Sequence, residues 1–128
     1  MTIAQRTLQY NFTVNAKTSI ANKSSLNLKM EWGLLHQITV YVPPGHVGQT
    51  GIQIYRSGTQ IVPWGGNSPW YNLNDTTVTF TIEDEVDTGL VAYGYNTDQV
   101  AHTFYVRLFY TPIVLVNKPV SLLPIQVI

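Results

Sequence analysis

The side chains best suited to metal binding or acid–base chemistry are three histidines, His36, His46 and His102. They lie far apart in the sequence, none stands at metal-ligand spacing from another histidine, and the chain contains no cysteine. Zinc sites combine several such ligands at short, fixed spacings, so we expect no metal site. His36 and His102 fall within strand patterns and are predicted to be half-buried there, whereas His46 lies in a proline–glycine turn.

The carboxylates form one cluster, which consists of Glu83, Asp84, Glu85 and Asp87. Hard cations such as calcium prefer several oxygens gathered on one loop, and paired carboxylates can act as general acid and general base. The glycine and the distal glutamate of an EF-hand loop are missing at the required offsets, and nothing in the sequence places a second carboxylate opposite the cluster. We therefore interpret it as the solvated end of a β-hairpin.

Motifs for nucleophilic and phosphate chemistry are absent from the sequence. It contains no G-x-S-x-G elbow for a catalytic serine, no G-x-G-x-x-G turn and no phosphate-cradling lysine loop. We therefore predict that the protein is not an enzyme and uses no cofactor.

One loop carries aromatic residues that could bind a ligand. The segment WGGNSPWYNLN, residues 64–74, contains Trp64, Trp70 and Tyr71 beside several asparagines. Flat aromatic faces next to amide side chains are suited to stacking on sugars, but aromatic residues also anchor glycine-rich loops to their own domain or fill a pocket on a partner. Anchoring or subunit contact is the favoured interpretation, and carbohydrate binding is the alternative.

The charge content restricts the possible partners. The 128 residues include 7 basic and 7 acidic ones, so 11 % are charged and the net charge is zero, against roughly 25 % charged residues in ordinary soluble domains. Without a basic cluster, the chain lacks the means to neutralise several phosphates or to bind an anionic membrane. We also expect no transmembrane span and no secretory leader, because no long apolar run or apolar signal core occurs.

The elements that must position these residues are β-strands. Apolar and polar residues alternate with period two, as they do in half-buried strands. Strand candidates cover residues 8–14, 26–30, 38–42, 52–54, 59–62, 77–82, 90–95 and 102–110, with a hairpin turn at Ser57-Gly58. No segment shows helical spacing over three turns.

About eight short strands in about 110 residues predict an all-β fold, namely a single antiparallel β-sandwich of jelly-roll or immunoglobulin-like topology. A small barrel is the alternative. The sequence does not supply the order of the strands. We assign residues 1–111 to this domain.

The segment 112–128 differs from the rest of the chain, and we interpret it as an extended apolar arm. It carries a single charge, Lys118, and prolines divide it into short β-prone pieces. Such a segment needs cover, either as an edge strand on its own domain or across a neighbouring subunit, and we favour the neighbour. The candidate contact residues are Ile113, Val114, Leu115, Val116, Val120, Leu122, Leu123 and Ile125.

Two stretches of the chain resemble a type of protein. Residues 38–64 contain a strand that runs into Pro43-Pro44-Gly45 and later Gly58-Thr59-Gln60-Ile61; residues 91–110 contain a Tyr-Asn-x-Asp turn before a His-Thr strand. In these features the chain is similar to small β-sandwich structural proteins of tailed bacteriophages. The resemblance rests on turn residues, not on catalytic ones. It implies a component of the virion, made in the host cytoplasm.

The leading functional hypothesis is therefore a non-enzymatic capsid decoration or cement subunit. It would stabilise a phage head by strand swapping within a homo-oligomer, with a trimer favoured, and by contacts to the major capsid protein or another virion protein. A tail or fibre subunit is a close variant. The alternative of another class is a carbohydrate-binding module for host attachment. No nucleic acid, membrane or metal is expected as a partner.

Overall fold

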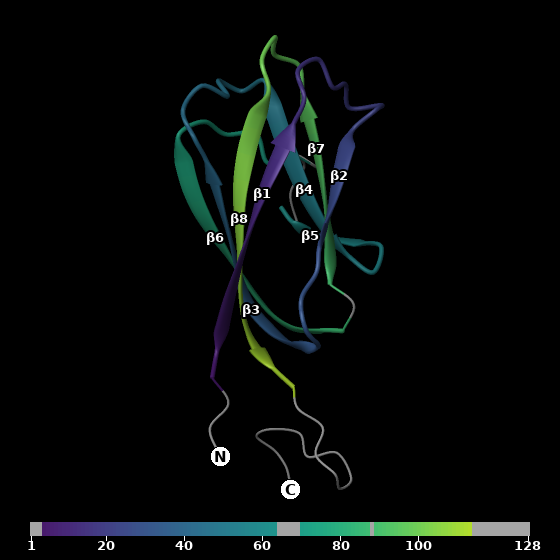
Figure 1. Ribbon diagram of the computed structural model, residues 1–128, viewed down its shortest axis with the longest axis vertical. Helices are drawn as coiled ribbons and strands as arrows, with labels where there is room; N and C mark the ends of the chain where they lie inside the picture. The colour runs from purple at the N-terminus through teal and green to yellow at the C-terminus, as the bar shows by residue number, and fades with distance from the viewer. Residues whose placement is uncertain (1–3, 64–69, 88, 114–128) are drawn as a thin grey trace, which may run out of the picture.

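The computed structural model describes residues 4–63, 70–87 and 89–113, and all regular structure within them is β-strand (Figure 1). The strands are β1 (Arg6–Val14), β2 (Ser24–Leu28), β3 (Gly33–Val42), β4 (Thr50–Arg56), β5 (Thr59–Val62), β6 (Thr76–Val86), β7 (Leu90–Asn96) and β8 (His102–Pro112). The predicted all-β class is confirmed, and so is the expected number of strands.

Alternation along each strand decides which side chains become buried. In β8, Phe104, Val106 and Leu108 are fully buried, whereas Tyr105 and Arg107 between them point to the outer face. Successive side chains of a strand lie on opposite faces of the sheet, so the period-two pattern of the sequence becomes one apolar and one polar face.

The strands form two antiparallel sheets. Sheet A has the order β1-β8-β3-β6, and sheet B has the order β2-β7-β4-β5. The pairs β1·β8, β2·β7, β3·β6 and β4·β5 are those of one long hairpin folded at Ser57-Gly58 and then rolled up. Of the two topologies predicted, the order is therefore that of the jelly roll, because an immunoglobulin-like sandwich would pair the first strand with the second.

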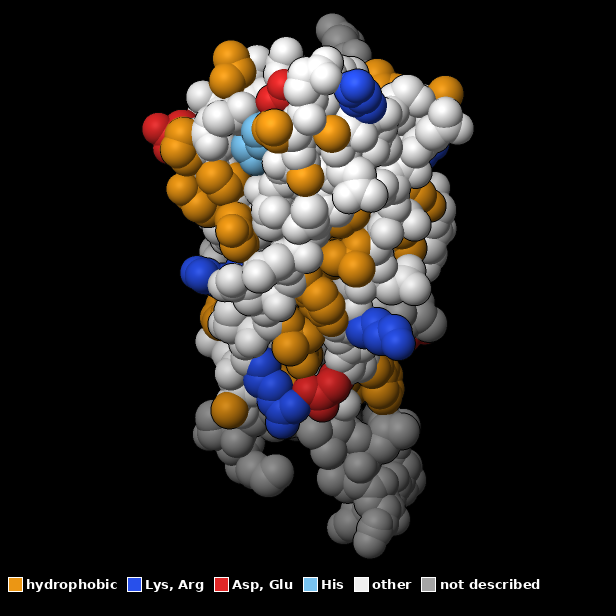
Figure 2. Space-filling view, turned by 45° about the horizontal axis from the view of Figure 1, so that its top comes forward, with side chains coloured by type: hydrophobic (Ala, Val, Ile, Leu, Met, Phe, Trp, Pro, Cys, Tyr) orange, Lys and Arg blue, Asp and Glu red, His pale blue; other side chains and the backbone are white. Residues whose placement is uncertain are grey.

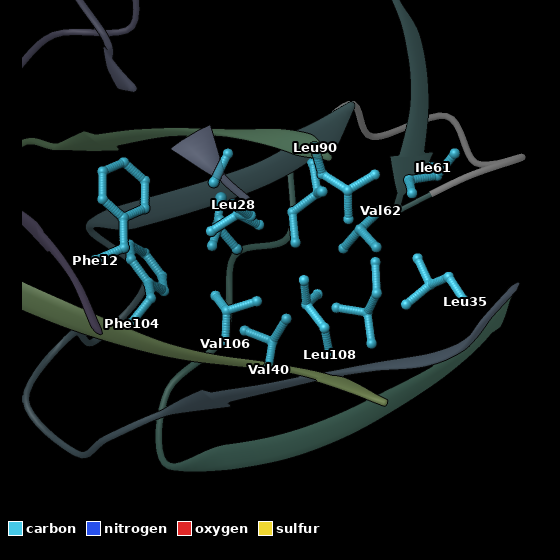
Figure 3. Close-up of a cluster of buried hydrophobic side chains, with 14 of the residues drawn as sticks. Phe12, Leu28, Leu35, Val40, Ile61, Val62, Leu90, Phe104, Val106 and Leu108 are labelled. Atoms are coloured by element: carbon cyan, nitrogen blue, oxygen red, sulfur yellow. The ribbon is translucent and has the colours of Figure 1, made fainter. Parts of the chain in front are cut away.

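The hydrophobic core lies between the two sheets. Figure 3 shows Val40, Val106 and Leu108 of sheet A pointing toward the side chains of sheet B. Leu28 and Val62 face them from the opposite layer, and all five are fully buried. Each such side chain stabilises the fold by about 1.5–3 kcal/mol relative to an exposed one.

Because successive strands run in opposite directions, the connections gather at two ends of the sandwich (Figure 1). The loop end carries the connections that follow β1, β3 and β7, together with the start of β6. The terminal end carries the connections that follow β2, β4 and β6, together with the start of β1 and the end of β8.

The acidic stretch does not lie where the sequence pattern placed it. Glu83, Asp84 and Glu85 belong to β6, which continues to Val86, so the interpretation as a solvated hairpin end was wrong. The β3–β6 register shifts between Leu35 and Gln37, and Glu83 adopts a φ of 54° there. This irregularity is a β-bulge, and it lets the strand continue beyond the point where the regular alternation breaks.

Candidate functional site

The two long sides of the sandwich, where an edge strand of one sheet faces an edge strand of the other, differ in how they are closed. We call them the β1–β2 seam and the β5–β6 seam. Sheet A ends in β1 and β6, and sheet B ends in β2 and β5. Edge strands expose unpaired backbone groups, to which another strand can add. The side chains and connections that cover each edge therefore show whether strand addition is blocked or possible there.

Side-chain hydrogen bonds close the β1–β2 seam at its terminal end. The Tyr10 hydroxyl donates to the Lys29 carbonyl, and the Arg6 guanidinium forms an ion pair with Glu31. The buried Tyr110 hydroxyl also donates to Glu31 Oε1, over 2.8 Å. Burial raises the pKa of Tyr110, and the hydrogen bond to Glu31 raises it further, so this hydroxyl remains a donor at neutral pH.

The β5–β6 seam is open by comparison. Val78, Phe80 and Ile82 point inward from β6 and are half-buried, as Leu8 and Tyr10 are on β1, so the difference between the seams lies in the space between the strands. A groove of about 300 Å³ runs between the strands. Its lining residues are Thr59, Gln60, Ile61, Thr81, Ile82 and Asp84. Among the described residues, β5 covers only part of β6, because β5 has 4 residues and β6 has 11.

The outer edge of β6 is available for pairing in the described part of the chain. β6 pairs with β3 on one side, and none of the described strands pairs with its other side. Every second residue of such an edge offers its N–H and C=O outward. The edge can therefore accept an extended segment by strand addition, with the half-buried apolar row beneath it available for alternate side chains.

Carboxylates mark the terminal end of this edge. Glu83 bonds to His36, with 2.8 Å between Oε1 and Nδ1, and Asp84 lies 3.8 Å from Arg56. Glu85 accepts a hydrogen bond of 2.5 Å from the Trp32 indole. The acidic cluster is thus tied to the fold by hydrogen bonds and one long ion pair.

The chain leaves β8 close to this acidic end. The Ile113 N–H donates to the Trp32 carbonyl over 2.9 Å, and Trp32 is the residue that binds Glu85. Ile113 is the one predicted arm contact within the described residues, where it is half-buried. The other predicted contacts, Val114, Leu115, Val116, Val120, Leu122, Leu123 and Ile125, lie outside them, so their role remains a prediction.

The described aromatic residues of the 64–74 loop contact their own domain. Tyr71 exchanges two backbone hydrogen bonds with Ile52, and its ring meets Phe80 edge-on at 5.4 Å. The Trp70 ring meets Tyr95 edge-on at 4.9 Å. Trp70 and Tyr71 thus pack on their own domain, whereas Trp64 lies outside the described residues.

At the loop end, two histidines that are far apart in sequence come together. The rings of His46 and His102 lie 4.4 Å apart, and His46 is fully buried. His46 Nδ1 bonds to the Thr50 hydroxyl, and its Nε2 bonds to a backbone carbonyl. Burial lowers the pKa of His46, and the neighbouring His102 lowers it further. His102 Nε2 bonds to Asp98 over 2.7 Å.

These histidines satisfy structural hydrogen bonds. Within residues 4–63, 70–87 and 89–113, no group of three or more histidine or carboxylate side chains converges as a metal site would require. The same part of the chain contains no helix long and apolar enough to cross a membrane.

Sequence reasoning missed the β5–β6 seam. Residues 77–82 were recognised as a strand, yet their position at an edge depends on strand order. One signal was present in the sequence, because Pro63 ends the strand candidate 59–62 after only four residues.

Comparisons with known proteins show a likeness of fold at most. No protein-family model matches the sequence, and no curated protein matches it. One similar solved structure is described as Bacillus endospore appendages that form a novel family of disulfide-linked pili; it is 17 % identical over 87 % of this chain and 89 % of its own, with a TM-score of 0.49. A chain of the cyanophage Pam1 capsid asymmetric unit is 9 % identical over 84 % of both chains, also with a TM-score of 0.49. At such low identity, neither likeness identifies what this chain binds or assembles with.

Proposed function

We propose that the protein is a non-enzymatic structural subunit that assembles with copies of itself, and that its place is on a phage particle as a capsid decoration or cement subunit. The observation that carries the proposal is the groove at the β5–β6 seam beside the 11-residue edge of β6, with which no described strand pairs. A monomer that exposes such an edge risks uncontrolled polymerisation, and a defined partner strand removes that risk. The likenesses to capsid and pilus structures carry no weight in this proposal.

The partner strand that we propose is the apolar segment 113–128 of a neighbouring copy. Its apolar pieces are β-prone, and its single charge, Lys118, complements the carboxylates Glu83, Asp84 and Glu85 on β6. At about 3.3 Å per residue the segment reaches about 50 Å when extended, which is enough to leave one subunit and cover the edge of the next. Exchange of identical segments between copies is a common route to closed oligomers.

The low charge of the molecule fits such an assembly. Figure 2 shows a surface on which charged side chains are few among uncharged polar and hydrophobic ones. Interfaces are depleted of charge at their centres, so a surface shared with neighbours accounts for the 11 % charged residues better than a surface fully exposed to water does.

Deletion of residues 113–128 tests the role of the segment. Sedimentation velocity of the full chain should show a closed oligomer, with three times the 14.4 kDa subunit mass expected for a trimer. The truncated protein should sediment as a monomer with an unchanged far-UV circular dichroism spectrum. A monomeric full chain whose stability does not depend on the segment would contradict the proposal.

The virion assignment has its own test. Genes for a major capsid protein or a portal should flank the gene for this chain, and the protein should be found in purified particles by mass spectrometry. Flanking metabolic genes, or absence from the particles, would overturn the assignment to a phage head and leave self-association to be judged by sedimentation.

A further inference from the structure

A groove of about 550 Å³ lies on the outer face of sheet A, away from both seams. Its main lining residues are Gln9, Thr39, Tyr41, Thr77, Tyr105 and Arg107. They come from all four strands of the sheet, so the position of each is set by a continuous hydrogen-bonded layer. Sites built on sheet strands hold their side chains more rigidly than sites on loops do.

The strand register arranges these side chains in two adjacent rows. Tyr105 of β8 pairs with Tyr41 of β3, and Tyr41 pairs with Thr77 of β6. In the next row outward-facing Arg107 lies between Gln9 of β1 and Thr39 of β3. An aromatic row therefore lies directly beside a row of hydrogen-bonding groups.

The aromatic row presents an apolar surface to solvent. The Tyr41 and Tyr105 rings stack, with centroids 5.8 Å apart and an angle of 30° between their planes. Tyr41 is 38 % exposed although it sits on a central strand. Tyrosine combines an apolar ring with a polar tip, so the pair can pack against an apolar face of a ligand and hydrogen-bond to its rim.

Arg107 gives the groove one positive charge, which no carboxylate in the described residues neutralises. In the described part of the chain Arg6 and Arg56 each form an ion pair, but Arg107 does not. Its Nη2 donates to Gln9 Oε1 over 3.2 Å, and none of the lining residues is acidic. The guanidinium fork therefore retains N–H donors for an anion, with the geometry that suits a carboxylate.

From this arrangement we propose that the groove binds a carboxylated sugar. The tyrosine pair would contact the apolar face of a pyranose ring, Arg107 would bind the carboxylate, and Gln9, Thr39 and Thr77 would bind hydroxyl groups. A single arginine is too little positive charge for a nucleic acid, whose binding requires several phosphates to be neutralised. Uronates and sialic acids both carry the required carboxylate.

The proposed site does not depend on the assembly model. Tyr41 and Arg107 point away from the core and lie on the two central strands, whereas the seams lie at the edges. If the protein does form an oligomer, each copy would present one groove, and several weak sites would act together on a polymeric glycan.

Isothermal titration of the full chain tests the proposal, with a sialylated trisaccharide and an oligogalacturonate as carboxylated probes and lactose as the neutral probe. We expect at least one carboxylated probe to bind and lactose to bind at least tenfold more weakly. Equal binding of lactose, or no binding of either carboxylated probe, would overturn the proposal.

Variants locate the binding in the groove. Arg107→Gln should weaken binding of the carboxylated probe by about tenfold or more, Arg107→Lys should restore only part of it, and Tyr41→Ala should weaken it as well. Tyr93→Ala is the matched control, because Tyr93 is a half-buried tyrosine on β7 in sheet B that also packs against another tyrosine. If Tyr93→Ala weakened binding of the carboxylated probe as much as Tyr41→Ala does, the binding would not be located in this groove. If the unmodified chain also bound a poly-glutamate peptide, and Arg107→Gln weakened that binding as much as it weakened sugar binding, the assignment to a sugar site would be overturned.

Discussion

The two seams of the sandwich solve the same problem in different ways. At the β1–β2 seam, Tyr10, Arg6 and Tyr110 all hydrogen-bond to the short connection 29–32. At the β5–β6 seam, Arg56 reaches across from β4 to the Glu85 carbonyl and Tyr71 packs on Phe80, but a groove of about 300 Å³ remains between the strands.

The difference follows from the connections. The link from β2 to β3 is short and stays at the terminal end, so it can supply Glu31 and a carbonyl to the neighbouring edge. β5 ends after four residues, and further along β4 the next described pairing is the bridge between Ile52 and Tyr71. Among the described residues, the connection 29–32 thus closes one side of the fold, and the other side is the one at which we propose that a neighbouring copy adds a segment.

A charge on the inward-facing row of β6 should have the largest effect of the predicted substitutions, and the affected quantity is the stability of the oligomer. Val78→Lys places an ammonium where the proposed partner strand packs, and we expect the apparent dissociation constant of the oligomer to rise about 100-fold. The long lysine chain can reach solvent from this half-buried position, so the monomer should remain folded.

Leu8→Lys is the matched control, since Leu8 is a half-buried inward-facing residue of β1 at the closed seam. Sedimentation equilibrium should show assembly close to that of the unmodified chain. Equal loss of assembly in both variants would mean that the two seams do not differ in the way that we describe.

Removal of the acceptor at the closed seam should have the next largest effect. Glu31→Ala leaves the buried Tyr110 hydroxyl without its acceptor and Arg6 without its partner, so the free energy of unfolding should fall by about 1–3 kcal/mol in urea titrations. Glu83→Ala removes an exposed carboxylate from β6 and should cost less than about 1 kcal/mol. A larger cost for Glu83→Ala would reverse our view of which seam stabilises the subunit.

The smallest predicted effect is a loss of stability in acid that comes from the loop end. Burial holds the pKa of His46 below its ordinary value of 6.5. Below pH 6.5 the unfolded chain therefore binds a proton that the folded chain resists, and stability falls by at most about 1.4 kcal/mol per pH unit until His46 itself is protonated.

Asp98 adds a loss in the same direction at lower pH. Its hydrogen bond with His102 lowers the pKa of the carboxyl from 3.8, so the stability that it contributes is present above about pH 4 and is lost as the pH falls through the lowered value. Urea titrations between pH 7 and pH 5 lie above the range of the Asp98 loss and therefore test the His46 effect. A His46→Gln variant should have a flatter profile in that range, and an unchanged profile would assign the acid sensitivity elsewhere. Because neither His46 nor His102 lies at a seam, the dependence of stability on pH should be the same in Val78→Lys and Leu8→Lys.

Local pattern predicted much of the fold. The alternation in residues 102–110 correctly separated buried Phe104 and Val106 from outward-facing Tyr105 and Arg107. Ser57-Gly58 correctly marked the β4–β5 turn, where both residues have positive φ values of 48° and 81°. The acidic stretch was misread because a bulge interrupts the alternation there, and charged residues in an edge strand look like those of a turn.

The sequence by itself determined the class of fold, the faces of the strands and the absence of recognisable catalytic motifs, because each depends on residues that are close together in the chain. The tertiary structure decided the order of the strands, and with it everything that lies between distant segments. Examples are the pairing of Tyr41 with Tyr105 across sheet A and the contact of His46 with His102. The physical reason is that an edge, a seam or a groove is a property of which strands become neighbours, and long-range pairing leaves no periodic signal in either strand.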